Sequence, residues 1–228
     1  MFSGHYDDWI KSRMSAIIKY INVESLKNKT LLELGCGYGH NGNEFYNLGC
    51  KVTSSDANCE HIQNGKNLYP HNDFKIIDGD KNIIREKYDI ILHWGLLYHL
   101  KEIEDHLKNV CEKCDVIILE TVVSDSDDDN FYITTNEKGY DQAYNNIGIR
   151  PSEKYVEKVL SNNGFKYFMI KDSVLNSSFN GHIKHIYDWE ITNTKKCQND
   201  GHSWLRRFWV CWNKNVDEKQ LFKDGVLV

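Results

Sequence analysis

The sequence has little of what usually separates or anchors parts of a chain. Its 228 residues contain 2 prolines and no stretch rich in glycine and serine, so no linker is predicted and residues 1–228 are expected to form one domain. No apolar run approaches the roughly 20 residues of a membrane span, and the first residues lack the pattern of a signal peptide. The seven cysteines are irregularly spaced. We therefore expect reduced thiols, a cytoplasmic location and no membrane partner.

An excess of basic residues is also lacking. The 28 Lys and Arg residues face 33 Asp and Glu residues, for a net charge of −5, which speaks against a nucleic-acid partner. The pair Cys111 and Cys114 has no second pair at the spacing of a zinc ribbon, and we predict no metal site. A zinc site built on these two cysteines, and a divalent ion at Glu120 or Asp125, stay open as alternatives.

Short apolar runs alternate with helical patterns through the first 120 residues. Apolar residues at steps of three and four predict a helix over residues 5–21, within an N-terminal helical cap of residues 1–27. Near-continuous apolar strands separated by helices are typical of a parallel sheet covered on both faces. The predicted strands are residues 30–34, 51–55, 74–77, 88–92 and 115–119, and the predicted helices between them are 41–48 and 103–111.

The pattern changes after residue 120. Residues 121–149 are polar, and neither helix nor strand is assigned there. A helix is predicted from 151 to 160, and strands at 165–170 and 208–212. Between these strands, residues 172–204 form an insertion longer than a hairpin loop needs, and loops of that length are usually functional or disordered.

Glycines and acids follow three of the predicted strands. A glycine-rich turn, residues 35–39, comes directly after the first strand, where backbone amides can approach a ligand closely. Asp56 ends the second strand, at a distance along the chain suited to an acid that binds a ribose diol. Gly79 and Asp80 follow the third. Each acid alone could be a helix N-cap, but together they lie at the sheet edge where open α/β sheets bind ligands.

Four motifs in order, residues 31–39, 52–56, 76–80 and 88–100, resemble those of the class I S-adenosylmethionine-dependent methyltransferases. The resemblance implies a Rossmann-like α/β fold, with a seven-stranded, mostly parallel sheet, helices on both faces and an antiparallel C-terminal strand pair. It also implies a cofactor-binding half, residues 28–120, and an acceptor-binding half, residues 121–228. The implied cofactor, S-adenosyl-L-methionine, would be held by Glu33, Gly35, Cys36, Gly37, Gly39, Asp56, Ala57, Gly79, Asp80 and His93.

The resemblance gives these residues separate roles. Glu33 and the backbone of His93 would lie near the methionine amino group, Asp56 would bind the ribose, and Asp80 with Gly79 would bind the adenine. The residues themselves agree on one point: an edge lined by acids suits a cationic ligand without phosphate and speaks against a dinucleotide.

The methyl acceptor is less defined. A hydroxyl acceptor needs a base, and histidine is the natural one near neutral pH; the candidates are His99, beside the fourth strand, and His182 or His185 in the insertion. We expect the insertion to fold over the cofactor edge. The favoured reaction is O-methylation of a small-molecule or carbohydrate acceptor. Two alternatives stay open: an RNA modifier, because residues 95–99 also resemble some tRNA wobble-uridine enzymes, and a non-catalytic partner subunit that binds S-adenosylmethionine. No oligomeric state is predicted.

Overall fold

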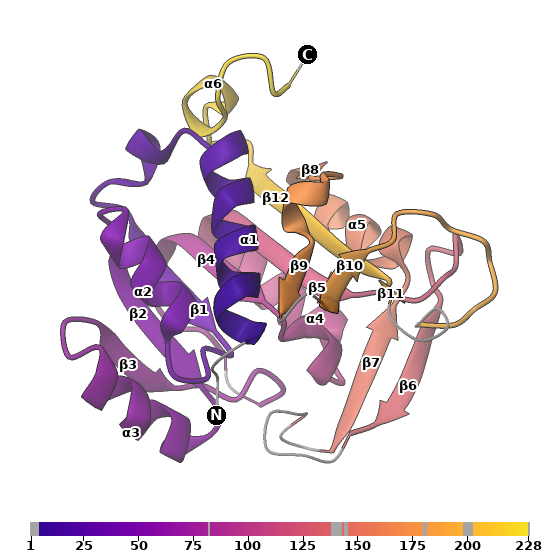
Figure 1. Ribbon diagram of the computed structural model, residues 1–228, viewed down its shortest axis with the longest axis horizontal. Helices are drawn as coiled ribbons and strands as arrows, with labels where there is room; N and C mark the ends of the chain where they lie inside the picture. The colour runs from indigo at the N-terminus through magenta and orange to yellow at the C-terminus, as the bar shows by residue number, and fades with distance from the viewer. Residues whose placement is uncertain are drawn as a thin grey trace.

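The main sheet has seven strands in the order β3-β2-β1-β4-β5-β12-β8 (Figure 1). The computed structural model describes residues 5–81, 83–137, 143, 146–179, 182–197 and 203–227. Strand β12 runs antiparallel to both neighbours, while the other neighbouring pairs are parallel. The predicted fold class, including the antiparallel C-terminal pair, is confirmed. The strands are β1 (Thr30–Leu34), β2 (Lys51–Asp56), β3 (Asp73–Ile76), β4 (Tyr88–Trp94), β5 (Cys114–Val122), β8 (Phe165–Met169) and β12 (Arg206–Asn213).

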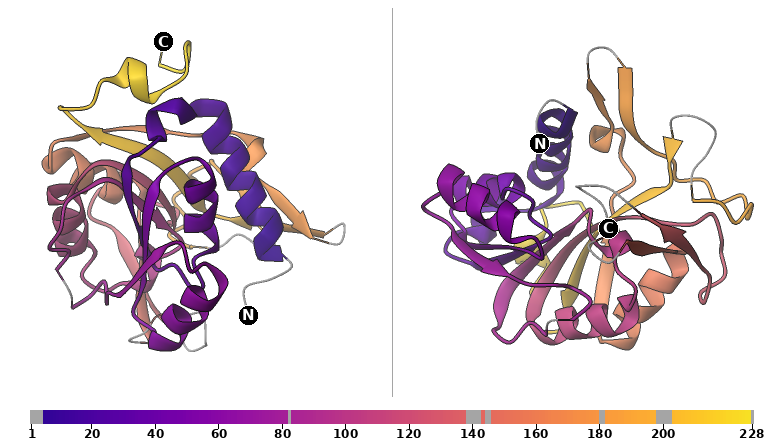
Figure 2. Two further views of the ribbon diagram at one scale, coloured as in Figure 1. Left: turned by 90° about the vertical axis from the view of Figure 1, so that its left-hand side faces the viewer. Right: turned by 90° about the horizontal axis from the view of Figure 1, so that it is seen from below.

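Helices cover both faces of this sheet (Figure 2). Side chains alternate along each strand, so that Leu31 packs with Ile17 of α1 and Phe45 of α2 on one face. Leu32 packs on the other, in the same cluster as residues of α4 and α5. The helices are α1 (His5–Tyr20), α2 (His40–Asn47), α3 (Cys59–Leu68), α4 (Ile103–Glu112), α5 (Glu153–Asn162) and α6 (Glu218–Leu221), with 3-10 turns η1 (Val23–Leu26), η2 (Leu97–His99) and η3 (Ser173–Leu175). None of the described helices is long and apolar enough to span a bilayer.

Two strands lie where the sequence analysis assigned none. Strands β6 (Tyr132–Asn136) and β7 (Ile147–Pro151) form an antiparallel hairpin beside η2. The amide of Ile149 donates to the carbonyl of Leu100 at 3.1 Å. A Cβ atom at Gly148 would overlap the carbonyl oxygen of Tyr98, so glycine allows the hairpin to approach η2 this closely.

The insertion forms a small sheet of its own, made of β9 (Ser177–Phe179), β10 (His182–Tyr187) and β11 (Ser203–Trp204). Its first part packs on α1: Ser12 Oγ donates to the carbonyl of Asn176 at 3.0 Å, and Tyr20 Oη donates to Asp172 at 2.7 Å. The insertion therefore lies against the N-terminal helix.

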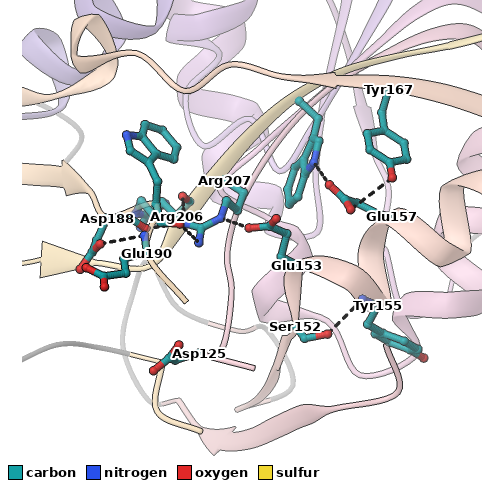
Figure 3. A network of polar contacts seen from close by, with 12 residues as sticks. Asp125, Ser152, Glu153, Tyr155, Glu157, Tyr167, Asp188, Glu190, Arg206 and Arg207 are labelled. Carbon is teal, nitrogen blue, oxygen red and sulfur yellow. Dashed lines mark hydrogen bonds and ion pairs between the residues drawn. The ribbon is translucent and has the colours of Figure 1, made fainter. Parts of the chain in front are cut away.

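The segment after β10 is fixed by two buried polar groups (Figure 3). The guanidinium of Arg207, fully buried, pairs with Glu153 and donates to the carbonyls of Asp188 and Trp189. The carboxylate of Asp125 accepts hydrogen bonds from backbone and side-chain groups of residues 192–194. These contacts anchor the segment to β12 and to the start of α5.

Candidate active site

A cavity of about 350 Å³ opens at the carboxyl ends of β1, β2 and β4. Most of the residues predicted to bind a cofactor lie around it, together with the predicted base His99. The predicted residues that line the cavity are Gly35, Cys36, Gly37, Asp56, Ala57, Gly79, Asp80 and His99. The topology explains this, because the ends of neighbouring parallel strands meet at one edge of the sheet.

The glycine-rich turn fixes the position of Asp56. Gly35, Gly37 and Gly39 have φ values of +65°, +52° and +84°, a region that other residues adopt only with strain. In this conformation the Gly37 amide donates to Asp56 Oδ2 at 2.9 Å, while the Asn58 amide donates to Oδ1 at 2.9 Å. The Asp56 carboxylate is thus held at the cavity wall.

Two buried histidines, His106 and His93, hold the loop after β3 through a chain of hydrogen bonds. His106 Nδ1 donates to the carbonyl of Gly79 at 3.0 Å, so its Nε2 accepts from His93 Nε2 at 2.8 Å. Burial lowers the pKa of His93, and lowers that of His106 to about 4, so both rings are neutral. His93, expected near the methionine amino group, does not line the cavity; the next residues, Trp94 and Gly95, do.

Glu33 and Gly39 also lie outside the cavity lining, so their predicted contacts with the cofactor stay a prediction. Strand alternation turns the Glu33 side chain, like that of Leu31, toward the face covered by α2. There Ser54 Oγ donates to Glu33 Oε2 at 2.7 Å, and burial raises the pKa of the carboxyl to about 7. Gly39 precedes α2 as its N-cap residue. Glu33 therefore lies beneath α2 with Ser54, and Gly39 sets the start of that helix.

A buried charge cluster lies at the ends of β5 and β12. Arg13 Nη2 donates to Glu120 Oε2 at 3.0 Å and Arg206 Nη1 to Glu120 Oε1 at 2.6 Å, with all three side chains at most 5% exposed. The Arg13 guanidinium also lies 3.3 Å from the centre of the Trp9 ring. One carboxylate between two guanidinium groups leaves one net positive charge. Arg13 is the sole Lys or Arg among the described residues that line the cavity.

The contacts of the candidate ligands also argue against the two metal sites that the sequence left open. Both oxygens of Glu120 are engaged by arginines, and those of Asp125 accept from Thr192 and Thr194. Neither carboxylate is therefore free to bind a divalent ion in this conformation. Burial raises the pKa of both Cys111 and Cys114, which disfavours the thiolate that zinc binds. Among the residues that the structure describes, no group of three or more metal-binding side chains comes together.

His99 is joined to the β6–β7 hairpin. Its Nδ1 bonds Glu137 Oε2, and the other oxygen of that carboxylate pairs with Arg150. The amide of Ala143 adds a third donor to Glu137 at 3.1 Å. Sequence reasoning missed Glu137 and Arg150, because they lie in a polar segment and are 38 and 51 residues from His99. Ala143 and Asn146, from the same part of the chain, line the cavity.

The other two histidines proposed as bases lie on the insertion. His182 and His185 belong to β10, but their side chains lie outside the described residues. Among the insertion residues whose side chains are described, 172–177 and 187–197, none lines the cavity. The expectation that the insertion covers the cofactor edge stays a prediction. The β6–β7 hairpin does reach the cavity, because Ala143 and Asn146, between its two strands, line it.

Comparisons with known proteins identify the family of this chain. The model of the family described as "Methyltransferase domain" matches residues 6–169. The tRNA U34 carboxymethyltransferase of Pseudoalteromonas translucida is 24% identical over 163 residues, which are 68% of this chain and 50% of that protein. The ubiquinone biosynthesis O-methyltransferase of Pelagibacter ubique is 30% identical over 100 residues, 40% of this chain and 42% of that protein. The chain thus spans half or less of these curated relatives.

A solved structure extends the similarity over almost the whole fold. The N-terminal domain of EvdMO1, crystallised with S-adenosylhomocysteine and D-fucose, superimposes with a TM-score of 0.64 at 16% identity, covering 92% of this chain and 84% of that chain. The chain belongs to the methyltransferase domain family. Its fold is that of the class I S-adenosylmethionine-dependent methyltransferases.

Proposed function

We propose that this protein transfers a methyl group from S-adenosyl-L-methionine to an oxygen of a small-molecule or sugar-type acceptor. The observation that carries the proposal is the set of charges that line the cavity: Asp56 ends β2, Asp80 follows β3, and Arg13 comes from α1. Two acids and one cation around the same cavity match a ligand that carries a diol, a positive sulfonium and a carboxylate.

Each part of this cofactor has a partner of suitable chemistry. Asp56, already held by two backbone amides, would accept from both ribose hydroxyls. Asp80, next to Gly79, would accept from the adenine amino group. Arg13, whose Nε has no hydrogen-bond partner within the described part of the chain, would pair with the methionine carboxylate, since charge-assisted hydrogen bonds are the strong ones. Bound in this way, the cofactor supplies an activated methyl group.

The acceptor side of the cavity is aromatic. Trp9, Trp94 and Tyr98 line it, and aromatic rings with a few hydrogen-bonding groups suit a sugar or a phenol. An oxygen acceptor also agrees with the D-fucose present in the EvdMO1 crystal and with the reaction named for the ubiquinone relative. His99, on the same wall, would accept the proton that the hydroxyl loses.

The protein's contribution to the rate would be alignment and proton removal. Methyl transfer is an in-line displacement, so the acceptor oxygen must be held on the side of the methyl carbon opposite the sulfur. The aromatic wall would orient the acceptor and exclude competing water. The Nε2 atom of His99 makes no hydrogen bond within the described part of the chain, so it is available to take the proton.

Calorimetric titration with S-adenosylhomocysteine tests the proposal. Asp56→Ala should weaken binding roughly tenfold to a hundredfold, because hydrogen bonds to a charged group contribute about 1.5–3 kcal/mol. Asp224→Ala, which removes an exposed carboxylate near the C-terminus, is the matched control and should bind like wild type. Absence of binding to the wild type, or binding of NAD in its place, would refute the proposal.

A second candidate, RNA modification, is favoured by the similarity to the tRNA U34 carboxymethyltransferase. The net charge of −5 argues against it, because phosphate contacts supply most of the affinity for RNA. Binding of tRNA that weakens steeply as salt rises would support this candidate over a small acceptor. Turnover by the isolated monomer would exclude a purely supporting role for a partner enzyme.

A further inference from the structure

The His99 ring is fixed by residues of the β6–β7 hairpin. We propose that Glu137, held in place by Arg150, is a positioning residue that keeps the proton of His99 on Nδ1 and its Nε2 open to the acceptor. The inference rests on the proposed function, in which His99 takes the acceptor's proton.

The Glu137 carboxylate has the environment that this role requires. Its side chain is 4% exposed and accepts from His99, Arg150 and the amide of Ala143. Burial alone would raise the pKa of Glu137, but the bonds from His99 and Arg150 lower it below its ordinary value. The carboxylate is therefore ionised and can only accept, so the proton between it and the ring belongs to His99 Nδ1.

A neutral imidazole with a proton on one nitrogen has a lone pair on the other. Fixing the proton on Nδ1 therefore makes Nε2 the basic atom. The His99 side chain is 12% exposed and lines the cavity, so that Nε2 is accessible there. A carboxylate bonded to Nδ1 is the arrangement by which hydrolytic enzymes hold a histidine in one tautomer and stabilise the cation that it forms.

Arg150 gives the arrangement its rigidity. Besides pairing with Glu137, it donates to the carbonyl of Tyr98, the residue before His99, and lies 4.8 Å from the centre of the Tyr98 ring. The same guanidinium thus contacts the acid and the backbone beside the base. Its charge also balances that of Glu137, so the proton that His99 would take up adds one positive charge to the trio of His99, Glu137 and Arg150.

The proton transfer is balanced without any further reactant. The acceptor's O–H bond breaks and its proton moves to His99 Nε2. The electron pair left on oxygen forms the new bond to the methyl carbon, while the pair of the C–S bond stays with sulfur. Glu137 remains ionised throughout and stabilises the imidazolium through the bond at Nδ1.

A buried Glu–Arg pair can also be purely structural, and the chain contains one for comparison. Glu153 pairs with Arg207, which is fully buried and bonded to the backbone at residues 188 and 189 (Figure 3). Neither residue lines the cavity. Glu153→Ala therefore removes a comparable ion pair without touching His99, and serves as the matched control.

The experiment is NMR of the histidine rings in the full chain labelled with ¹⁵N-histidine, bound to S-adenosylhomocysteine. The signals lost in His99→Gln identify His99. We expect wild-type His99 to show a protonated Nδ1 and an unprotonated Nε2. Glu137→Ala should lose this pattern and populate the Nε2–H form, whereas Glu137→Gln, which retains a carbonyl acceptor, and Glu153→Ala should keep it.

Two outcomes would overturn the inference: an Nε2–H tautomer in the wild type, or a His99 pattern that is the same in Glu137→Ala as in the wild type. The wild-type spectrum decides the question even if Glu137→Ala does not fold. Calorimetry on the same samples separates the two proposals, because a protein that binds S-adenosylhomocysteine but has the wrong tautomer refutes only the role of Glu137.

Discussion

Burial of Glu33 beside the glycine-rich turn should make the stability of the protein depend on pH in an unusual direction. The carboxyl lies behind the cavity wall with Ser54, and its pKa is raised from 4.5 to about 7. Between these two values the unfolded chain releases the proton while the folded protein retains it. The free energy of unfolding contributed by this group should therefore fall as pH rises from about 4.5 to about 7, and stay constant above that.

The magnitude follows from the change in pKa. At about 1.4 kcal/mol for each pKa unit, the rise from 4.5 to about 7 corresponds to about 3 kcal/mol. Glu33→Gln keeps the shape and an oxygen acceptor for Ser54 Oγ but cannot ionise. The variant should therefore match wild type near pH 4.5 and become more stable than wild type by up to about 3 kcal/mol at pH 8.

Urea unfolding of both proteins at pH 4.5, 6 and 8 measures this difference, and subtracting one curve from the other cancels the titration of all shared groups. Glu112→Gln, at an exposed position at the end of α4, is the control and should give a flat difference. A constant offset between wild type and Glu33→Gln, or a variant that loses stability at pH 8, would refute the reasoning.

Two further predictions concern the cavity wall. Arg13→Gln should weaken binding of S-adenosylhomocysteine about tenfold to a hundredfold by calorimetry, since it removes the cation proposed to pair with the methionine carboxylate. The same change at the exposed Arg85 is the control and should have no effect on binding. Unaltered binding in Arg13→Gln would contradict the role proposed for Arg13. Gly148→Ala should lower the free energy of unfolding by about 1–3 kcal/mol, because the added Cβ would overlap the Tyr98 carbonyl. Gly164→Ala, where only the backbone conformation is strained, should cost less in urea unfolding, and an equal loss would argue against the steric cause.

The parts of the site that follow from the order of the strands could be predicted from the sequence. Apolar runs located the parallel strands, and the residues after β1, β2 and β3 then had to meet at one edge. The orientation of side chains was harder. The motif placed Glu33 near the methionine amino group, and the alternation of strand β1 turns its side chain toward α2, where it does not line the cavity.

Contacts between distant parts of the chain could not be read from local pattern. Arg13, Glu120 and Arg206 meet across separations of 107 and 86 residues, and no periodicity links them. The β6–β7 hairpin escaped prediction because β6 is largely polar and exposed, and β7 has only two alternating apolar residues, Ile147 and Ile149. Two such residues are too few to mark a half-buried strand. Its residue Glu137 was missed for the same reason.

The meeting of Arg13, Glu120 and Arg206 has a consequence for how the protein becomes active during synthesis. These residues come from the first helix, a central strand and the penultimate segment of the chain. Before β12 has been translated and inserted beside β5, Glu120 has one arginine partner instead of two, so the cluster that holds Arg13 at the cavity wall is incomplete. A ribosome-bound chain lacking residue 206 would therefore contain the glycine turn and Asp56 but an incomplete cavity. Capture of the cofactor should accordingly become tight only after β12 has left the ribosome.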